Sequence, residues 1–195
     1  MRQLWDRPDL VREGDSKPWD TYTAVGRVLS QWESVEIQLG YIYAAASGKP
    51  GDWYSLIEYG EGTTTSHRVR ILREAVNTFF LSHCHQASEG RVETLLQTAG
   101  HFAARRHDIA HAIVRDHNWA RWRIPPDTRD TVGYFLLPSH YKGNAYDDTA
   151  LPIYAYTANS MEALRYQLIL LETEAMGVAE LLRRLAGGST PQAHG

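Results

Sequence analysis

Residues 88–114, SEGRVETLLQTAGHFAARRHDIAHAIV, carry apolar side chains that recur every three or four positions. This spacing matches the period of an α-helix, about 3.6 residues per turn, and it places the apolar side chains on one face. We therefore expect a long amphipathic helix over residues 88–114. The inward face of this helix comprises Val92, Leu95, Ala99, Phe102, Ile109 and Ile113.

Three further segments show the same period, at residues 20–47, 64–85 and 159–185. Gly48 and Pro50 follow the first of these segments and Gly187 follows the last, and both residue types commonly end helices. The stretch between the first two segments, residues 48–63, is predicted to be a loop or a broken turn. Together with residues 88–114, the three segments predict an all-α fold, a four-helix up-down bundle.

Residues 115–158 lie between the third and fourth predicted helices and differ from them in composition. Prolines and glycines separate short aromatic runs, WARWRI, TVGYFLLP and PIYAYT. Such runs predict a short β-like insertion of two or three strands, or an extended flap. The ends of the chain are predicted to be an irregular arm over residues 1–19 and a flexible tail over residues 187–195. The length of the chain suits one domain over residues 20–186.

The composition is that of an ordinary globular protein, with 43% hydrophobic and 22% charged residues. No run of residues is as long and apolar as a membrane span, and the N-terminal sequence MRQLWDRPDLVREGD differs from a secretory signal. The single cysteine, Cys84, excludes an internal disulfide and a cysteine-based zinc cage. The net charge of -3 is unlike the basic field of many nucleic-acid-binding proteins. We expect a cytoplasmic protein without a membrane partner.

Two charged residues interrupt the apolar faces of their predicted helices. Arg106 lies near the centre of the apolar face of residues 88–114, and Glu36 lies within the apolar face of residues 20–47. A buried guanidinium needs a partner because it cannot lose its proton. We therefore expect a buried Glu36–Arg106 ion pair. Such a pair would fix how two helices pack even in a protein without catalytic function, so this structural alternative stays open.

The other polar residues of this region lie away from the apolar face. On a helical wheel His107 and His111 lie on one side at positions i and i+4, with Arg115 and Asp108 beside them. Histidine changes its charge near neutral pH, so an exposed pair of histidines suits proton transfer. A solvated helix surface is the alternative interpretation of the same pattern.

The stretch Ala104–Ala112 resembles the Arg-polar-x-x-x-His signature of HEPN domains, with Arg106, His107 and His111 at the signature positions. HEPN domains are helical bundles, and many of them are ribonucleases of toxin–antitoxin, RNA-guided and antiphage systems. The resemblance implies a homodimer whose paired motifs form one composite cleft. It also implies RNA as the substrate and an antitoxin or another protein as a partner.

The resemblance further implies a chemistry that needs neither a metal nor another cofactor. A ribose 2′-OH attacks the adjacent phosphate, His111 acts as general acid or base, and Arg106 stabilises the scissile phosphate. Asp108 or His107 would orient His111 or bind the substrate. On an ideal helix Arg106 and His111 lie about 140° apart. The site therefore requires a second subunit, a distorted helix, or the length of the arginine side chain.

Two other functions fit parts of the same sequence, and the first is a metal site. His107-Asp108-x-x-His111 is similar to the His-Glu-x-x-His helix of zinc enzymes and contains the His-Asp pair of HD-type phosphohydrolases. The run Ser82-His83-Cys84-His85 upstream would supply a first ligand. The arginines next to the motif argue against this function, because they would repel a cation.

The second alternative is a non-catalytic interaction or RNA-binding module. Trp119 and Trp122 alternate with Arg121 and Arg123 in the predicted flap. Alternating aromatic and cationic side chains suit stacking on nucleic-acid bases. They suit equally well a strand whose tryptophans pack on the bundle, so the pattern leaves both interpretations open.

Overall fold

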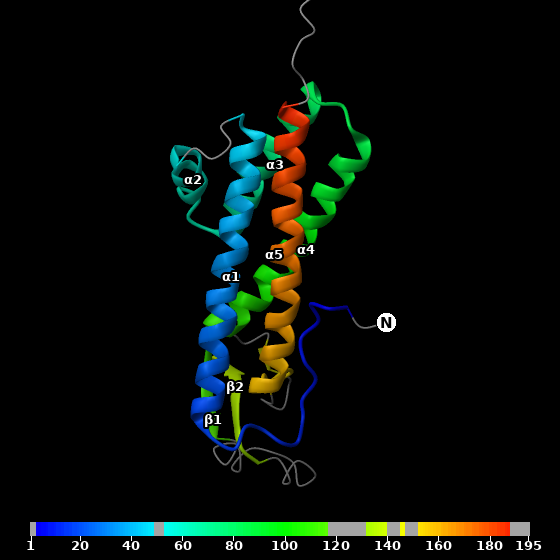
Figure 1. The fold of residues 1–195 in the computed structure, drawn as a ribbon. Helices are drawn as coiled ribbons and strands as arrows, with labels where there is room; N and C mark the ends of the chain where they lie inside the picture. The colour runs from blue at the N-terminus through cyan, green and yellow to red at the C-terminus, as the bar shows by residue number, and fades with distance from the viewer. Residues whose placement is uncertain (1–2, 49–52, 117–131, 140–144, 147–151, 188–195) are drawn as a thin grey trace, which may run out of the picture. The chain divides into compact units, whose positions relative to one another are not determined.

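The computed structural model describes residues 3–48, 53–116, 132–139, 145–146 and 152–187 (Figure 1). The described part of the chain is mostly helical, as the periodicity predicts, and it also contains a two-stranded sheet. In chain order the elements are α1 (Pro18–Ala46), α2 (Trp53–Gly60), α3 (Thr65–Ser82), α4 (Gln86–Ala110), β1 (Ala112–Asp116), β2 (Tyr134–Pro138) and α5 (Ala158–Gly187). Within these ranges, no helix is both long and apolar enough to cross a membrane.

The chain divides into two compact units. Unit 1 contains residues 1–32 and 104–168, and unit 2 contains residues 33–103 and 169–195. The long helices α1, α4 and α5 each contribute residues to both units. Because α4 passes from unit 2 into unit 1 at residue 104, the whole Arg106-to-His111 motif belongs to unit 1.

In unit 1 the chain forms an antiparallel hairpin directly after α4. Strand β1 pairs with β2 in a register that runs from Ala112 opposite Pro138 to Asp116 opposite Tyr134. The N-terminal arm extends this pairing, since the amide of Gly14 donates to the carbonyl of Val132 at 2.8 Å. A Cβ atom on Gly14 would lie 2.6 Å from the backbone oxygen of Tyr134, so the close approach of the arm requires glycine.

Asp15 ties the same arm to two helices of unit 1. Its carboxylate accepts a hydrogen bond from the amide of Ala158, the first residue of α5, at 2.9 Å. It also accepts one from the hydroxyl of Thr21 in α1 at 2.6 Å. Thr157 and Ser160 complete the cap, with the Thr157 amide bonded to the Ser160 hydroxyl. The arm predicted to be irregular is therefore anchored at its helical end.

Unit 2 has a core of aliphatic and aromatic side chains from α1, α3, α4 and α5. Two ion pairs between exposed side chains also join its helices, Arg73–Glu93 between α3 and α4 and Arg91–Glu174 between α4 and α5. The buried side chains of this core include Val35, Leu39, Ile42, Leu72, Val76, Phe79, Val92, Leu95, Ala99, Leu171, Ala175 and Val178.

The predicted loop over residues 48–63 is wrong in its middle part, because α2 forms there at Trp53–Gly60. Tyr59 of α2 is buried, and its ring lies 5.9 Å from the ring of Tyr43 in α1. A Cβ atom on Gly40 would lie 3.1 Å from the side chain of Leu56, so α2 packs closely on α1. Eight residues are too few for a hydrophobic period to be distinguished from chance, which is why the sequence pattern misses this helix.

The third predicted helix is also wrong at its C-terminal end, where β1 replaces the last turn. Helix α4 ends at Ala110, and residues 112–116 pair with β2. The spacing of Ile113 continues the helical period, but in the strand its side chain is 40% exposed. β-branched Ile113 and Val114 favour a strand, and the partner strand decides between the two conformations. The WARWRI run of the predicted insertion and residues 188–195 of the predicted tail lie outside the described residues.

Candidate functional site

The C-terminal end of α4 brings two imidazole rings into contact. His107 lies in the last turn of α4, and the amide of His111 donates to the carbonyl of His107 at 3.3 Å, which continues the helical turn by one residue. The two ring centroids are 4.4 Å apart, and the rings are tilted by 53°. Both side chains are exposed. The structure therefore presents a pair of accessible imidazole rings at one helix end.

The hairpin fixes the backbone of His111. The hydroxyl of Ser139 donates to the carbonyl of His111 at 2.6 Å, just beyond the first pair of the sheet. The hydroxyl of Tyr146 donates to the carbonyl of Pro138 and holds the same end of β2. A carbonyl at the end of a helix has no partner within that helix, so the Ser139 hydroxyl satisfies it. The sequence pattern does not reveal Ser139 and Tyr146, because only the strand pairing brings them here.

The arginines of the motif lie less exposed than the histidines. Arg106 on α4 and Arg115 on β1 are both half-buried. Arg115 does not lie on a helix, so its predicted position on the helical wheel is wrong. Burial raises the pKa of Tyr146, and the positive charge of Arg115 opposes that shift. Arg115 therefore lies close enough to Tyr146, which binds the end of β2, to act on its hydroxyl electrostatically.

Asp108 is buried, which contradicts its predicted outward position. Only 4% of its surface is exposed. Arg7 of the N-terminal arm binds it through two hydrogen bonds, from Nε to Oδ2 at 2.9 Å and from Nη2 to Oδ1 at 3.1 Å. Arg105 adds an ion pair with an Nη2–Oδ2 distance of 3.4 Å. A helical wheel assigns Asp108 to the face of α4 opposite the apolar side chains. It cannot show that the N-terminal arm covers that face.

Two buried tyrosines complete the surroundings of Asp108. The guanidinium of Arg7 lies 4.4 Å from the ring centroid of Tyr154, and the rings of Tyr154 and Tyr156 are 5.7 Å apart in an edge-to-face arrangement. Burial raises the pKa of Tyr154 to about 12, and the negative charge of Asp108 contributes. The pKa of Tyr156 is also raised, first by burial and then by Asp108. Asp108 is thus the centre of a buried polar cluster.

These tyrosines make the fold sensitive to alkaline pH. We expect Tyr154 and Tyr43, whose pKa burial also raises to about 12, to stay protonated above pH 10 while the protein is folded. The unfolded chain loses these protons near its ordinary pKa of about 10, so above that pH it binds fewer protons than the native state. The contribution of these tyrosines to the free energy of unfolding should therefore be constant below about pH 10 and fall towards pH 12.

Absorbance at the phenolate band and circular dichroism, recorded together during an alkaline titration, check this expectation. A fraction of the tyrosines should ionise only as the helical signal is lost. Tyr154→Phe should reduce that fraction, whereas Tyr166→Phe, at an exposed position, should leave it unchanged. Ionisation of all tyrosines near their ordinary pKa, with the helical signal intact, would contradict the burial described above.

Glu36, in unit 2, is buried as predicted but has a different partner. Its carboxylate accepts hydrogen bonds from the hydroxyls of Tyr59 at 3.0 Å and Thr65 at 3.3 Å. The guanidinium of Arg68 lies 3.4 Å away, in the role that the helical wheel predicts for Arg106. The wheel shows that Glu36 faces inward, but the element that covers it includes α2, which the sequence pattern misses. Glu36 therefore joins α1 to α2 and α3.

Removal of the Glu36 carboxylate should destabilise the protein. Glu36→Ala strands Arg68 and two hydroxyls, and we expect a loss of about 2–4 kcal/mol in the free energy of unfolding, measured by urea denaturation. Glu36→Gln, which keeps an acceptor for Tyr59, should lose less. Glu74→Ala, in an exposed ion pair with Arg70, is the matched control and should change stability by less than about 1 kcal/mol. Equal losses for Glu36→Ala and Glu74→Ala would refute the buried role.

The residues considered as upstream metal ligands have local structural partners. The ring of His83 stacks on Phe79 at 4.1 Å and contacts its carbonyl oxygen through Nδ1. Nδ1 of His85 lies 2.7 Å from the hydroxyl of Ser88 in the first turn of α4. Cys84 is exposed. Across the described ranges, no group of three or more His, Cys, Asp or Glu side chains is arranged to hold a metal ion.

Comparisons with protein-family models, with curated proteins and with solved structures found no match to this chain. A function for the protein therefore has to be inferred from the residues of the chain and from their geometry.

Proposed function

We propose that this protein is a metal-independent endoribonuclease in which His111 transfers the proton and Arg106 binds the scissile phosphate. The observation that carries this proposal is the exposed His107–His111 pair, with 4.4 Å between ring centroids, at the end of α4. Arg106 precedes His107 directly in the chain and is half-buried, as suits a cation that must be held in place. The order of these residues also resembles the HEPN signature.

The chemistry needs two proton transfers, and two imidazoles can supply both. A neutral imidazole removes the proton of the ribose 2′-OH as its oxygen attacks the adjacent phosphorus. A protonated imidazole gives a proton to the departing 5′-oxygen, so the products are a 2′,3′-cyclic phosphate and a 5′-hydroxyl. The guanidinium of Arg106 stabilises the negative charge that builds up on the phosphate oxygens. No metal enters this scheme, and no cofactor is proposed.

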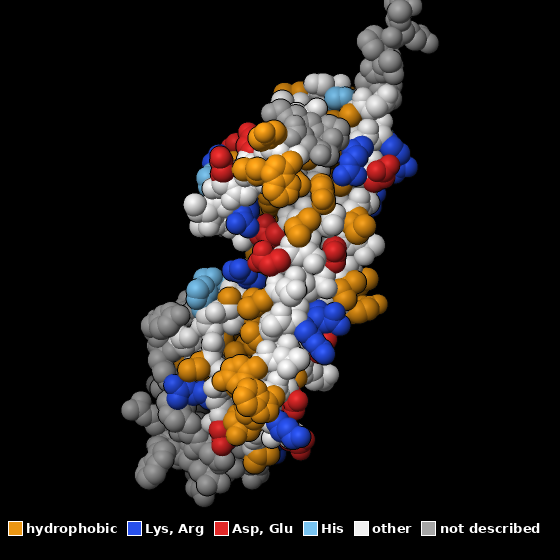
Figure 2. Space-filling view, turned by 60° about the vertical axis from the view of Figure 1, so that its left-hand side comes forward, with side chains coloured by type: hydrophobic (Ala, Val, Ile, Leu, Met, Phe, Trp, Pro, Cys, Tyr) orange, Lys and Arg blue, Asp and Glu red, His pale blue; other side chains and the backbone are white. Residues whose placement is uncertain are grey.

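Binding of RNA would depend on local groups rather than on the overall charge. The net charge is -3, and on the face drawn in Figure 2 basic and acidic side chains are interspersed. Arg106 and Arg115 flank His111 in the chain, and both are half-buried. We therefore propose that the protein contacts only a short segment of RNA around the cleavage site, since a weakly charged surface gives little long-range attraction.

The same motif supports a more specific proposal for the architecture. We propose a HEPN-like four-helix bundle made by the long helices α1, α3, α4 and α5, which acts as a homodimer in the cytoplasm with an antitoxin or another protein as a partner. Support comes from the spacing of Arg106 and His111, which lie about 140° apart around an ideal helix. A second copy would bring an Arg106 to the side of α4 where His111 lies.

Incubation of the purified full-length protein with a mixed RNA, with and without EDTA, tests the proposed function. Cleavage that persists in EDTA and leaves 2′,3′-cyclic phosphate ends supports the metal-independent reaction. Cleavage that EDTA abolishes and zinc restores would instead indicate the metal-dependent phosphohydrolase. A folded protein that binds RNA without cleaving it would refute the nuclease and favour the binding module.

A further inference from the structure

The ion pair between Arg7 and Asp108 has two unequal halves. The side chain of Asp108 is 6% exposed and belongs to α4, whereas the side chain of Arg7 is 37% exposed and belongs to the N-terminal arm. Tyr154, which packs beneath the guanidinium, is fully buried. Both halves belong to unit 1: α4 supplies the buried acceptor, and the N-terminal arm supplies the more exposed donor.

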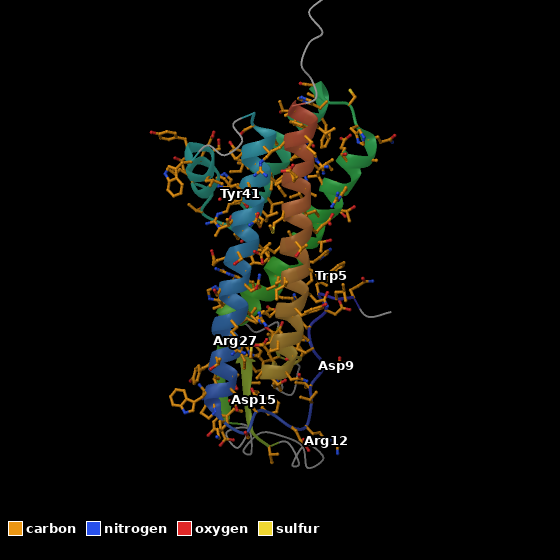
Figure 3. All side chains as sticks on the ribbon, in the orientation of Figure 1. Trp5, Asp9, Arg12, Asp15, Arg27 and Tyr41 are labelled. Atoms are coloured by element: carbon orange, nitrogen blue, oxygen red, sulfur yellow. The ribbon has the colours of Figure 1, made fainter. Side chains whose placement is uncertain are left out.

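The aliphatic side chains of the arm are exposed. Figure 1 shows it in dark blue, running beside the first part of α5 before it joins α1, and Figure 3 marks its course with Trp5, Asp9 and Arg12. Leu4, Leu10 and Val11 are 64%, 52% and 48% exposed. Because the hydrophobic effect scales with the apolar area removed from water, these side chains contribute little to holding the arm. The contacts of Arg7 therefore contribute to its attachment before Gly14, together with the half-buried Trp5.

The surroundings of Asp108 favour a guanidinium over any other cation. The two carboxylate oxygens meet two nitrogens of Arg7, and the guanidinium carbon of the same group lies over the ring of Tyr154. A planar fork with several N–H donors fits both partners at once, whereas an ammonium presents a single point charge. The hydroxyl of Tyr156 makes no hydrogen bond to any described residue, and its oxygen can accept one from a guanidinium.

We propose that Asp108 and Tyr154 form a guanidinium-binding site, which Arg7 occupies within the chain and which accepts an arginine side chain of another peptide segment when the arm lifts. The arm is then a displaceable ligand of Asp108, which belongs to α4, the helix that carries His107 and precedes His111. This site is independent of the nuclease proposal, because it requires neither RNA nor catalysis.

Chemical rescue of the full-length Arg7→Ala variant tests the site. Ethylguanidinium should raise the melting temperature of this variant saturably, by about 2–4 °C, because a ligand that binds only the native state stabilises it. Ethylammonium at the same concentration and ionic strength should not. The variant that combines Arg7→Ala with Asp108→Asn should lose the effect. Equal rescue by ethylammonium, no rescue, or rescue that persists without the carboxylate would each overturn the proposal.

Peptides identify the source of the arginine. A peptide of residues 1–16 should bind the Arg7→Ala variant in calorimetry, and the same peptide with Arg7→Gln should not. An unrelated arginine-bearing peptide that binds equally well would show that the site takes any accessible arginine, whereas selective binding of the arm peptide would point to exchange with a second copy. Equal binding of the Arg7→Gln peptide would overturn the proposal. If Arg7→Ala does not fold, Arg7→Gln, which removes the guanidinium and adds no cation, replaces it in both experiments.

Discussion

Replacement of Asp108 by alanine is expected to lower the free energy of unfolding by about 3–5 kcal/mol, the largest stability effect of any single change that we propose. The carboxylate is buried and is the common partner of Arg7 and Arg105. Arg7 can turn towards water when its partner is removed, but Arg105 is only 16% exposed and would keep an uncompensated charge. Urea denaturation of the purified variant measures the loss.

Three variants separate the charge from the packing. Asp108→Asn keeps the shape of the side chain, so its loss reports the charge alone. Arg7→Ala should lose only about 1 kcal/mol, because the Arg7 side chain is more than one-third exposed and water screens its charge. The variant that combines Arg7→Ala with Asp108→Asn completes a thermodynamic cycle. We expect its loss of unfolding free energy to differ from the sum of the losses of the two single variants. A larger loss for Arg7→Ala than for Asp108→Ala would mean that Asp108 is not the buried anchor of the cluster.

The long helices could be predicted because each buries a continuous apolar face. In α1, for example, Val28, Trp32, Val35 and Leu39 are buried and share one side of the helix. A repeat of this length seldom arises by chance, so the predicted ranges differ from α1, α3 and α5 by only a few residues. The same reasoning fails where the repeat is short, as in α2, or where a strand continues it by chance, as at Ile113.

The partners of the buried charges could not be predicted, because they come from distant parts of the chain. Asp108 meets Arg7 across 101 positions of sequence, and Glu36 meets Arg68 only after α2 and the turn that follows it. A helical wheel assigns each charge to a face and supplies no information about the segment that covers that face. Glu36 was therefore predicted to be buried with a different partner, and Asp108 was predicted to be exposed.

The histidine pair is the part of the site that local spacing does determine. Positions i and i+4 lie one above the other on a helix, and His107 and His111 do so even though α4 ends between them. The hold of the hairpin on His111, through the Ser139 hydroxyl, depends on the register of β1 and β2 and had no counterpart in the sequence pattern. The sequence therefore predicts that the two histidines are neighbours, but it does not predict the hydrogen bond from Ser139 that fixes His111.

Replacement of His111 by alanine is expected to reduce the rate of RNA cleavage by about 10²–10⁴-fold, because the proposed reaction loses its principal general acid or base. The melting temperature should stay nearly constant, since the ring is exposed and the Ser139 hydroxyl bonds to the His111 backbone, which alanine retains. Cleavage of a defined RNA in EDTA, with variants purified in the same way as the unaltered protein, measures the effect. The controls must distinguish the chemistry of this ring from an exposed histidine in general and from a contaminating nuclease.

His101→Ala is the matched control, because His101 is an exposed histidine of the same helix, about three turns before His111. It should cleave at the rate of the unaltered protein, and His107→Ala should fall between the two if the second ring supplies the other proton transfer. Arg106→Lys keeps a positive charge without the planar fork, so it should bind RNA but cleave it more slowly. Unchanged cleavage by His111→Ala would show that the activity belongs to other residues or to a contaminant, whatever the fate of Arg106→Lys.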